Sequence, residues 1–188
     1  MIAGPRRSRR LLAAALALAA LPAIPVPPAA AQAVAPDAPA VLDRDLFLPA
    51  DRGWQIYVNA RYGTSFAFPA DVFTPSPPPE NGDGRRFLAQ DATLEIYAWT
   101  NAEREDASSL KTRLIGSEGY QDVTYSPSGE SWLVLSGHRG DHIFYEKYFF
   151  RGDTIHGFGM EFPAASKPRY APIIERIEDS FRAQPPSG

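Results

Sequence analysis

From residue 54 onward, apolar and polar positions alternate with the period of two that is typical of half-buried β-strands. In "WQIYVN", for example, Trp54, Ile56 and Val58 fall on one side of an extended chain. The pattern predicts eight strands, at residues 54–59, 62–69, 85–90, 93–99, 120–125, 131–137, 142–151 and 154–162. Turn-forming residues separate most of these segments, so we expect antiparallel hairpins.

Two further segments show the helical period of 3.6 residues. Residues 106–116 contain the i, i+4 pair Leu110 and Leu114. Asp106 is a suitable N-cap for this helix, and Gly116 is a suitable end. The second helix, at residues 169–182, carries one apolar stripe formed by Tyr170, Ile173, Ile174, Ile177 and Phe181.

The turn between the two longest strands predicts which residues pair across them. A two-residue turn at Gly152-Asp153 would pair Phe149 with His156, Glu146 with Gly159 and Phe144 with Glu161. One face would then carry Ile143, Tyr145, Phe149, Phe158, Met160 and Phe162, and the other Phe144, Tyr148, Phe150 and Ile155. A slip of one residue would exchange the faces. Both faces are apolar and need cover, so we expect an α+β domain: a single antiparallel sheet of about six to eight strands packed with two helices.

The first 33 residues have the three parts of a secretory signal peptide. Arginines occupy four positions between Arg6 and Arg10, an apolar segment follows at 11–24, and Ala31-Gln32-Ala33 is a small-x-small cleavage site. We expect cleavage near Ala33 and a periplasmic or secreted product. Both the general secretory route and the twin-arginine route fit this leader.

Charge and cysteine content narrow the possible partners. The chain has 19 basic and 22 acidic side chains; without the four leader arginines, 15 basic and 22 acidic groups remain, a net charge of −7. This balance argues against nucleic-acid binding and docking on anionic lipid. Prolines interrupt the apolar leader early, so we expect no stable membrane insertion. The absence of cysteine from the sequence excludes disulfides and a lipid-modified N-terminal cysteine.

The expected organisation is therefore simple. Residues 1–33 form the signal peptide, 34–50 an Ala/Pro-rich linker, 51–183 a single α+β domain, and 184–188 a disordered tail. Within the linker, Leu46-Phe47-Leu48 is apolar enough to pack onto the domain.

The segments "RYGTSFAFPADVFTPSPPPENGDGRRFLAQDATLEIYA" and "SWLVLSGHRGDHIFYEKYFF" resemble a group of exported proteobacterial proteins without an assigned function. The order of elements over residues 54–182 also resembles the Mog/PsbP-like α+β fold, and "YGTSFAFP" is similar to its opening strand. That fold occurs in photosystem extrinsic subunits, a Ran-binding protein and exported bacterial lipoproteins. The resemblance implies a domain that binds or stabilises partners, and it transfers no site residue to this chain.

Glu146 and Glu161 are the candidate catalytic residues. In the expected register they share one sheet face at diagonal positions, about 7 Å apart. Paired carboxylates are the minimum for glycoside hydrolysis, and Phe144 and Tyr148 lie nearby to stack on a sugar. The alternative is that the two acids reach solvent or pair with basic side chains.

Two turns carry possible metal ligands. "GHRGDH" places His138, Asp141 and His142 at a hairpin tip, although His142 should point to the opposite face. "PSPPPENGDGRRF", residues 75–87, resembles a calcium loop in part but lacks the ligands expected at its first and twelfth positions. An exposed polar turn at the first segment and a glycine-assisted turn at the second explain both without a metal.

Aromatic residues near strand ends are the candidate ligand-binding residues. Trp99, Tyr120 and Tyr125 could line the rim of a groove. No nucleotide, cofactor or nucleophile motif occurs in the sequence, and we expect no cofactor. The sequence favours an exported, soluble, non-catalytic domain that binds an unidentified protein or small ligand in the cell envelope. A cell-envelope hydrolase using Glu146 and Glu161 is the alternative.

Overall fold

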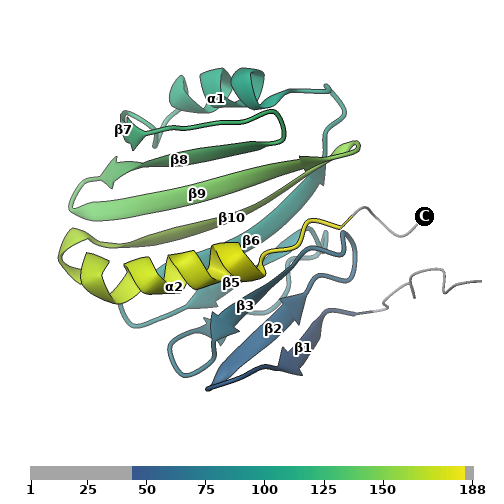
Figure 1. Ribbon diagram of the computed structural model, residues 1–188, viewed down its shortest axis with the longest axis vertical. Coiled ribbons are helices and arrows are strands. Elements are labelled where there is room, and N and C mark those ends of the chain that lie inside the picture. The colour runs from purple at the N-terminus through teal and green to yellow at the C-terminus, as the bar shows by residue number, and fades with distance from the viewer. Residues whose placement is uncertain (1–43, 185–188) are drawn as a thin grey trace, which may run out of the picture. The chain divides into compact units, whose positions relative to one another are not determined.

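The computed structural model describes residues 44–184 (Figure 1). The predicted signal peptide, the cleavage site near Ala33 and residues 185–188 lie outside the described residues. The strands are β1 (Leu46–Pro49), β2 (Trp54–Val58), β3 (Ser65–Pro69), β4 (Thr74–Pro75), β5 (Gly84–Leu88), β6 (Thr93–Thr100), β7 (Asp122–Tyr125), β8 (Trp132–Arg139), β9 (His142–Arg151) and β10 (Thr154–Pro163). The helices are α1 (Ala107–Ile115), the short 3₁₀ helix η1 (Ala164–Ser166) and α2 (Lys167–Ser180).

The strands form two antiparallel sheets, so the prediction of a single sheet is wrong. Seven strands pair in the order β4-β5-β6-β10-β9-β8-β7, and β1-β2-β3 form a separate small sheet. The small sheet packs its aromatic side chains against the large sheet instead of extending it by hydrogen bonds. Tyr57, Phe66 and Phe68 are fully buried there. Burial of these three rings stabilises the face-to-face arrangement by about 2 kcal/mol each.

Strand β1 falls inside the segment that was expected to be a linker. It pairs with β2, matching Leu46 with Val58 and Pro49 with Gln55. Phe47 contacts the ring of Phe87 on the large sheet, with the ring centroids 6.5 Å apart. The apolar Leu46-Phe47-Leu48 run therefore belongs to the folded unit.

The β9–β10 hairpin has the register that its turn predicts. Phe149 pairs with His156, and Glu146 pairs with Gly159. Gly152 has a φ of +57°, which a two-residue hairpin turn requires and which glycine adopts without strain. The two faces therefore carry the predicted apolar sets.

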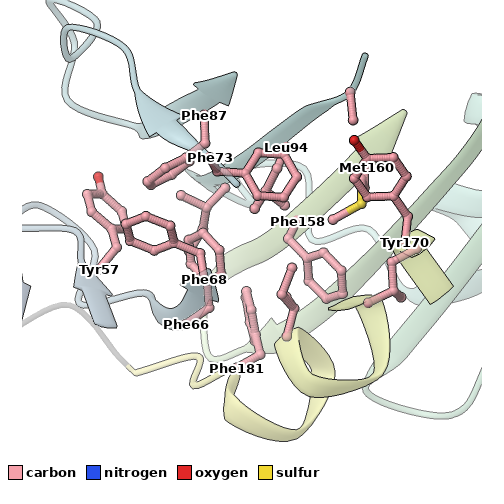
Figure 2. Close-up of a cluster of buried hydrophobic side chains, with 14 of the residues drawn as sticks. Tyr57, Phe66, Phe68, Phe73, Phe87, Leu94, Phe158, Met160, Tyr170 and Phe181 are labelled. Atoms are coloured by element: carbon pink, nitrogen blue, oxygen red, sulfur yellow. The ribbon is translucent and has the colours of Figure 1, made fainter. Parts of the chain in front are cut away.

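The larger core lies between one face of the large sheet, the small sheet and α2 (Figure 2). Its fully buried side chains include Tyr57, Phe66, Phe68, Phe73, Phe87, Leu94, Phe158, Phe162, Tyr170 and Ile177. Phe87 of β5 meets Phe66 of the small sheet edge-to-face, with centroids 5.4 Å apart at 89°. The apolar stripe of α2 faces this core, as the sequence pattern predicts.

A smaller core lies on the opposite face, beneath α1. Ala107 and Leu110 of the helix pack on Leu133 and Leu135 of β8 and on neighbours from β9 and β10. The Asp106 side chain caps the helix by accepting a hydrogen bond from the Ser109 backbone N–H at 2.7 Å. Because α1 packs mainly on β8, it leaves the β5–β6 part of this face without a helix (Figure 1).

No helix within residues 44–184 is both long and apolar enough to cross a bilayer.

Candidate functional site

The part of the large sheet that α1 leaves uncovered carries a defined set of side chains. Cross-strand pairing of Arg86 with Glu95, and of Glu95 with Gly159, places these positions on one face. We call this surface the open face; it consists of Arg86, Leu88, Glu95, Tyr97 and Glu161. Leu88 is 49% exposed on this surface.

Two hollows border the open face. The first lies between the proline-bearing loop at residues 76–83 and strands β5 and β6. The second lies between the β5–β6 turn and the ends of β9 and β10, where His142 and Glu161 line it. Both hollows are lined by Arg86, Leu88 and Glu95, so they adjoin each other along the strands.

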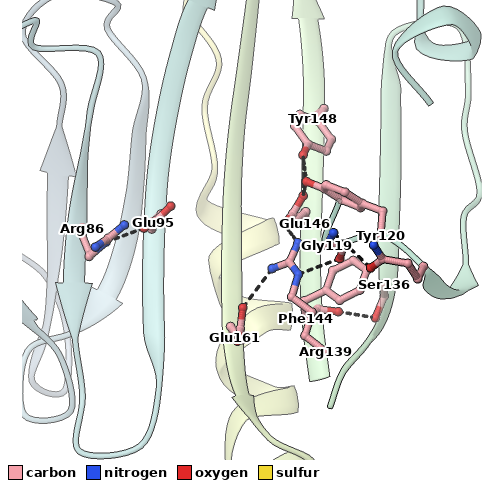
Figure 3. A network of polar contacts seen from close by, with 11 residues as sticks. Arg86, Glu95, Gly119, Tyr120, Ser136, Arg139, Phe144, Glu146, Tyr148 and Glu161 are labelled. Carbon is pink, nitrogen blue, oxygen red and sulfur yellow. Dashed lines mark hydrogen bonds and ion pairs between the residues drawn. The ribbon is translucent and has the colours of Figure 1, made fainter. Parts of the chain in front are cut away.

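The predicted carboxylate pair does lie on this face of the sheet, but one arginine holds both groups (Figure 3). Arg139 donates from Nη2 to Glu146 Oε1 at 2.8 Å and from Nη1 to Glu161 Oε2 at 2.9 Å. Its Nε donates to the Gly119 carbonyl at 2.9 Å, and its guanidinium lies 4.2 Å from the centroid of Phe144. Burial alone lowers the pKa of Arg139, but the hydrogen bonds to the two glutamates outweigh it and raise the pKa above its usual value.

Glu146 is buried within a cluster of tyrosines. Tyr120 and Tyr148 both donate to Glu146 Oε2, at 2.6 Å and 2.5 Å. Burial, followed by the charge of Glu146, raises the pKa of Tyr120 to about 12. Burial, Tyr97 and Glu146 raise the pKa of Tyr148 well above its usual value. Both hydroxyls therefore stay protonated at neutral pH and can donate to the carboxylate.

This arrangement differs from that of a glycosidase, in which two carboxyl groups flank the bond to be cleaved. Both oxygens of Glu146 already accept hydrogen bonds, and the residue is only 8% exposed. The geometry instead matches the alternative reading of the sequence, in which the acids pair with a basic side chain. Glu161, whose side chain is 40% exposed, is the member of the pair that reaches the open face.

The three metal-ligand candidates lie around the β8–β9 turn. His142 Nδ1 lies 2.8 Å from Asp141 Oδ1, while His138 pairs across the hairpin with Ile143 and so belongs to the opposite face. No group of three or more His, Cys, Asp or Glu side chains in residues 44–184 is placed to hold a metal ion. The structure thus brings Asp141 and His142 together and separates His138 from them.

The three aromatic candidates occupy different environments. Trp99 packs against Tyr97 and Tyr148 in the smaller core, and Tyr120 is tied to Glu146. Tyr125 is 57% exposed and pairs with Ser136, on the opposite face of the sheet. They do not form one rim.

The segment of residues 75–87 forms a turn leading into β5. Gly82 has a φ of +64°, and the Asn81 side chain donates to Asp83 Oδ2 at 2.6 Å. Gly84 begins the strand at a point where a Cβ atom would lie 2.0 Å from the Ile96 carbonyl oxygen. Tight turn geometry and close backbone approach explain the glycines.

Sequence reasoning missed Arg139, which organises the carboxylates, and Leu88, which marks the open face. The signal for Arg139 was present: its pairing with His142 puts it on the face of Glu146 once the β8–β9 turn is known to contain two residues. No local signal marks Leu88, because its exposure depends on where α1 packs.

Comparison with solved structures agrees with the observed architecture. The cyanobacterial PsbP protein CyanoP from Synechocystis sp. PCC 6803 superposes with a TM-score of 0.55 and covers 72% of this chain and 95% of its own. The fold is PsbP-like. Identity between the two sequences is 10%, so the similarity establishes the fold alone. No protein-family model and no curated protein sequence matches the chain.

The PsbP-like prediction made from the sequence is thus confirmed at the level of fold. The structure has the two helices and the antiparallel strands that the sequence predicts. It also has a second sheet, which the sequence does not predict. The proposed relation to exported proteobacterial proteins remains a prediction.

Proposed function

We propose that this chain is exported, is cleaved near Ala33, and acts in the periplasm or outside the cell as a non-catalytic binding domain. The partner is a protein or small ligand of the cell envelope, and the open face is the binding surface. The observation that carries the proposal is that α1 leaves β5 and the first half of β6 without helical cover beside two adjoining hollows. The half-exposed Leu88 lies where these hollows meet.

The hydrogen bonds that occupy the Glu146 carboxylate favour a binding role over hydrolysis. An ion pair and two tyrosine hydroxyls hold this carboxylate in place and occupy both of its oxygens. A rigid sheet with fixed side chains is a suitable support for a docking surface, since little order has to be gained on binding.

A photo-crosslinking amino acid at position 88 tests the proposal in the native cell. We expect a discrete adduct in the periplasmic or secreted fraction, carried by a chain whose N-terminus is Val34. Ile115 is the matched control, because it is 39% exposed and lies at the end of α1, away from the open face. An adduct pattern that is the same at positions 88 and 115, or absent at 88, would contradict the proposed binding surface. A cytoplasmic, uncleaved chain would contradict export.

A further inference from the structure

The turn that leads into β5 contains an asparagine followed directly by a glycine. Asn81 is exposed to solvent, and Gly82 has a φ of +64° with nothing within 4 Å of the point where a Cβ atom would lie. The backbone nitrogen after an asparagine can attack the carbon of the side-chain amide, and a glycine at that position puts no side chain in its way. The turn therefore holds an accessible amide beside an unhindered nitrogen.

The two other asparagines of the sequence lack these properties. Asn59 is 1% exposed, and its side-chain oxygen accepts the Tyr62 backbone N–H at 2.8 Å. Asn101 uses both of its side-chain polar atoms on the Glu105 backbone, at 2.8 Å and 2.9 Å. Each of the two is followed by an alanine, whose Cβ atom hinders the attack. Of the three asparagines, Asn81 is the one that the structure leaves open to this reaction.

We infer that Asn81 is a modification site at which water converts the side-chain amide to aspartate or isoaspartate, and that this conversion releases the proline-bearing loop. The Gly82 nitrogen forms a bond to Asn81 Cγ and gives up its proton, while the Cγ–Nδ2 bond breaks and the amide nitrogen leaves as ammonia. Water then opens the cyclic imide at either of its carbonyl groups. The net change consumes water and releases ammonia, so it needs no oxidant and no cofactor.

The fold restrains this reaction but does not bury the site. The Gly82 N–H donates to the Pro79 carbonyl at 3.0 Å, and the Asn81 side chain donates to Asp83 Oδ2 at 2.6 Å. Both hydrogen bonds hold the reacting groups in the turn, so the imide forms when the turn opens locally. The folded protein should therefore react more slowly than a free peptide of the same sequence.

Conversion would undo the contacts that hold the loop in place. The Asn81 carbonyl accepts a hydrogen bond from Arg61, and the Gly82 carbonyl accepts one from Asn59 Nδ2 at 3.0 Å, which fastens the loop to the turn between β2 and β3. Aspartate at position 81 would set a carboxylate against Asp83 in place of an amide donor. Isoaspartate would take the carbonyl that Arg61 binds out of the main chain. The loop forms one wall of the first hollow, so its release would change that wall.

The site is tested by incubating the purified protein at neutral pH and measuring the change from amide to acid at each asparagine by mass spectrometry of its digest. We expect Asn81 to convert at least about tenfold faster than Asn101, because a Cβ atom hinders the second site. A free peptide of residues 78–84 should convert at least about threefold faster than the folded protein, because it has no turn to open. Conversion at Asn81 no faster than at Asn101 would overturn the assignment.

A variant tests the restraint. Arg61→Gln removes one of the contacts that fasten the loop, so conversion at position 81 should speed up toward the rate of the peptide. Arg52→Gln is the matched control, because Arg52 has a side chain that is 88% exposed and lies on the turn between β1 and β2, and it should leave the rate unchanged. Equal rates in the two variants would contradict the role given to the fastened loop.

Release of the loop is measured by hydrogen exchange. The Ala98 amide donates to the Asp83 carbonyl at 2.8 Å, so its exchange should rise at least about threefold in the converted protein. The Val134 amide, which donates to the Pro127 carbonyl at 2.9 Å, is the control and should keep its rate. Unchanged exchange at Ala98 after conversion would overturn the release. None of these measurements depends on the proposed binding function, which the crosslink at position 88 tests separately.

Discussion

Two ion pairs on one face of the large sheet differ in how deeply they are buried. Arg139 and Arg86 are both ion-paired with a glutamate on the same face. The side chains of Arg139 and Glu146 are 28% and 11% exposed, against 61% and 38% for Arg86 and Glu95. Burial should make the first pair matter for stability and the second matter little, because water screens exposed pairs.

Replacing Arg139 with methionine should therefore lower the free energy of unfolding by about 3 kcal/mol, since it leaves the Glu146 charge buried without its ion-pair partner. The matched change Arg86→Met should cost less than about 1 kcal/mol. Urea unfolding followed by tryptophan fluorescence measures both. Adding Glu146→Gln to Arg139→Met should recover part of the loss; equal effects at the two arginines would contradict this account.

His156 predicts a dependence of stability on pH. It is fully buried, its Nδ1 lies 2.7 Å from Thr64 Oγ1, and its Nε2 has no partner within the described residues. Burial, followed by the charge of Arg151, lowers the pKa of His156 from 6.5 to about 4. The unfolded chain then binds a proton that the folded chain excludes. The contribution of neutral His156 to the free energy of unfolding is fully present above pH 6.5. It is lost as the pH falls toward 4, by on the order of 3 kcal/mol.

The measurement is the free energy of unfolding at several pH values between 7 and 4.5. The variant His156→Met should have a shallower slope than the wild type over this range, whatever its stability at pH 7. The exposed His138 provides the control, and His138→Gln should keep the wild-type slope. Parallel slopes for the wild type and His156→Met would refute the assignment.

At the scale of elements, the sequence predicts those whose boundaries are set locally. The α1 cap at Asp106 and its end at Gly116 are visible in the residues themselves, and the structure confirms both. The β9–β10 register follows from the two-residue turn at Gly152-Asp153. Strand β1 has no such signal, because the surrounding sequence is rich in alanine and proline; it becomes a strand by pairing with β2.

Close strand contact at Gly137 gives a prediction for β7. A Cβ atom at this position would lie 1.9 Å from the Asp122 carbonyl oxygen, so the backbone of β7 would have to move. We expect Gly137→Ala to destabilise the protein by at least about 2 kcal/mol and to increase hydrogen exchange in β7. Gly116 is the control: its added Cβ would meet nothing closer than 3.5 Å. Unchanged protection of β7 amides in Gly137→Ala would count against the close approach.

At the scale of the whole molecule, the N-terminal boundary of the folded unit can be tested directly. Asp45 accepts a hydrogen bond from the Tyr57 hydroxyl at 2.7 Å and forms an ion pair with Arg85 at 3.3 Å. Arg85 is largely buried, and β1 also brings Phe47 against Phe87. Removing β1 would leave Arg85 without its carboxylate.

A chain that starts at residue 51 should therefore be less stable than one that starts at residue 44 by about 3 kcal/mol. Denaturant midpoints of the two chains give the comparison. If the shorter chain were as stable as the longer one, β1 would be dispensable and the boundary predicted from composition would be the correct one.

The pattern of residues along the chain predicts the strand and helix periods, the α1 cap, the β9–β10 register and the shared face of Glu146 and Glu161. These are local properties, since side-chain period and turn length act over a few residues. Three features follow instead from the folding of the whole chain: β1–β3 form a second sheet, Arg139 holds both glutamates, and Leu88 stays exposed. The second sheet and the exposure of Leu88 depend on how far each covering layer extends across the large sheet. That extent is set by packing between segments that lie far apart in the chain. The local alternation of apolar and polar residues carries no information about such contacts.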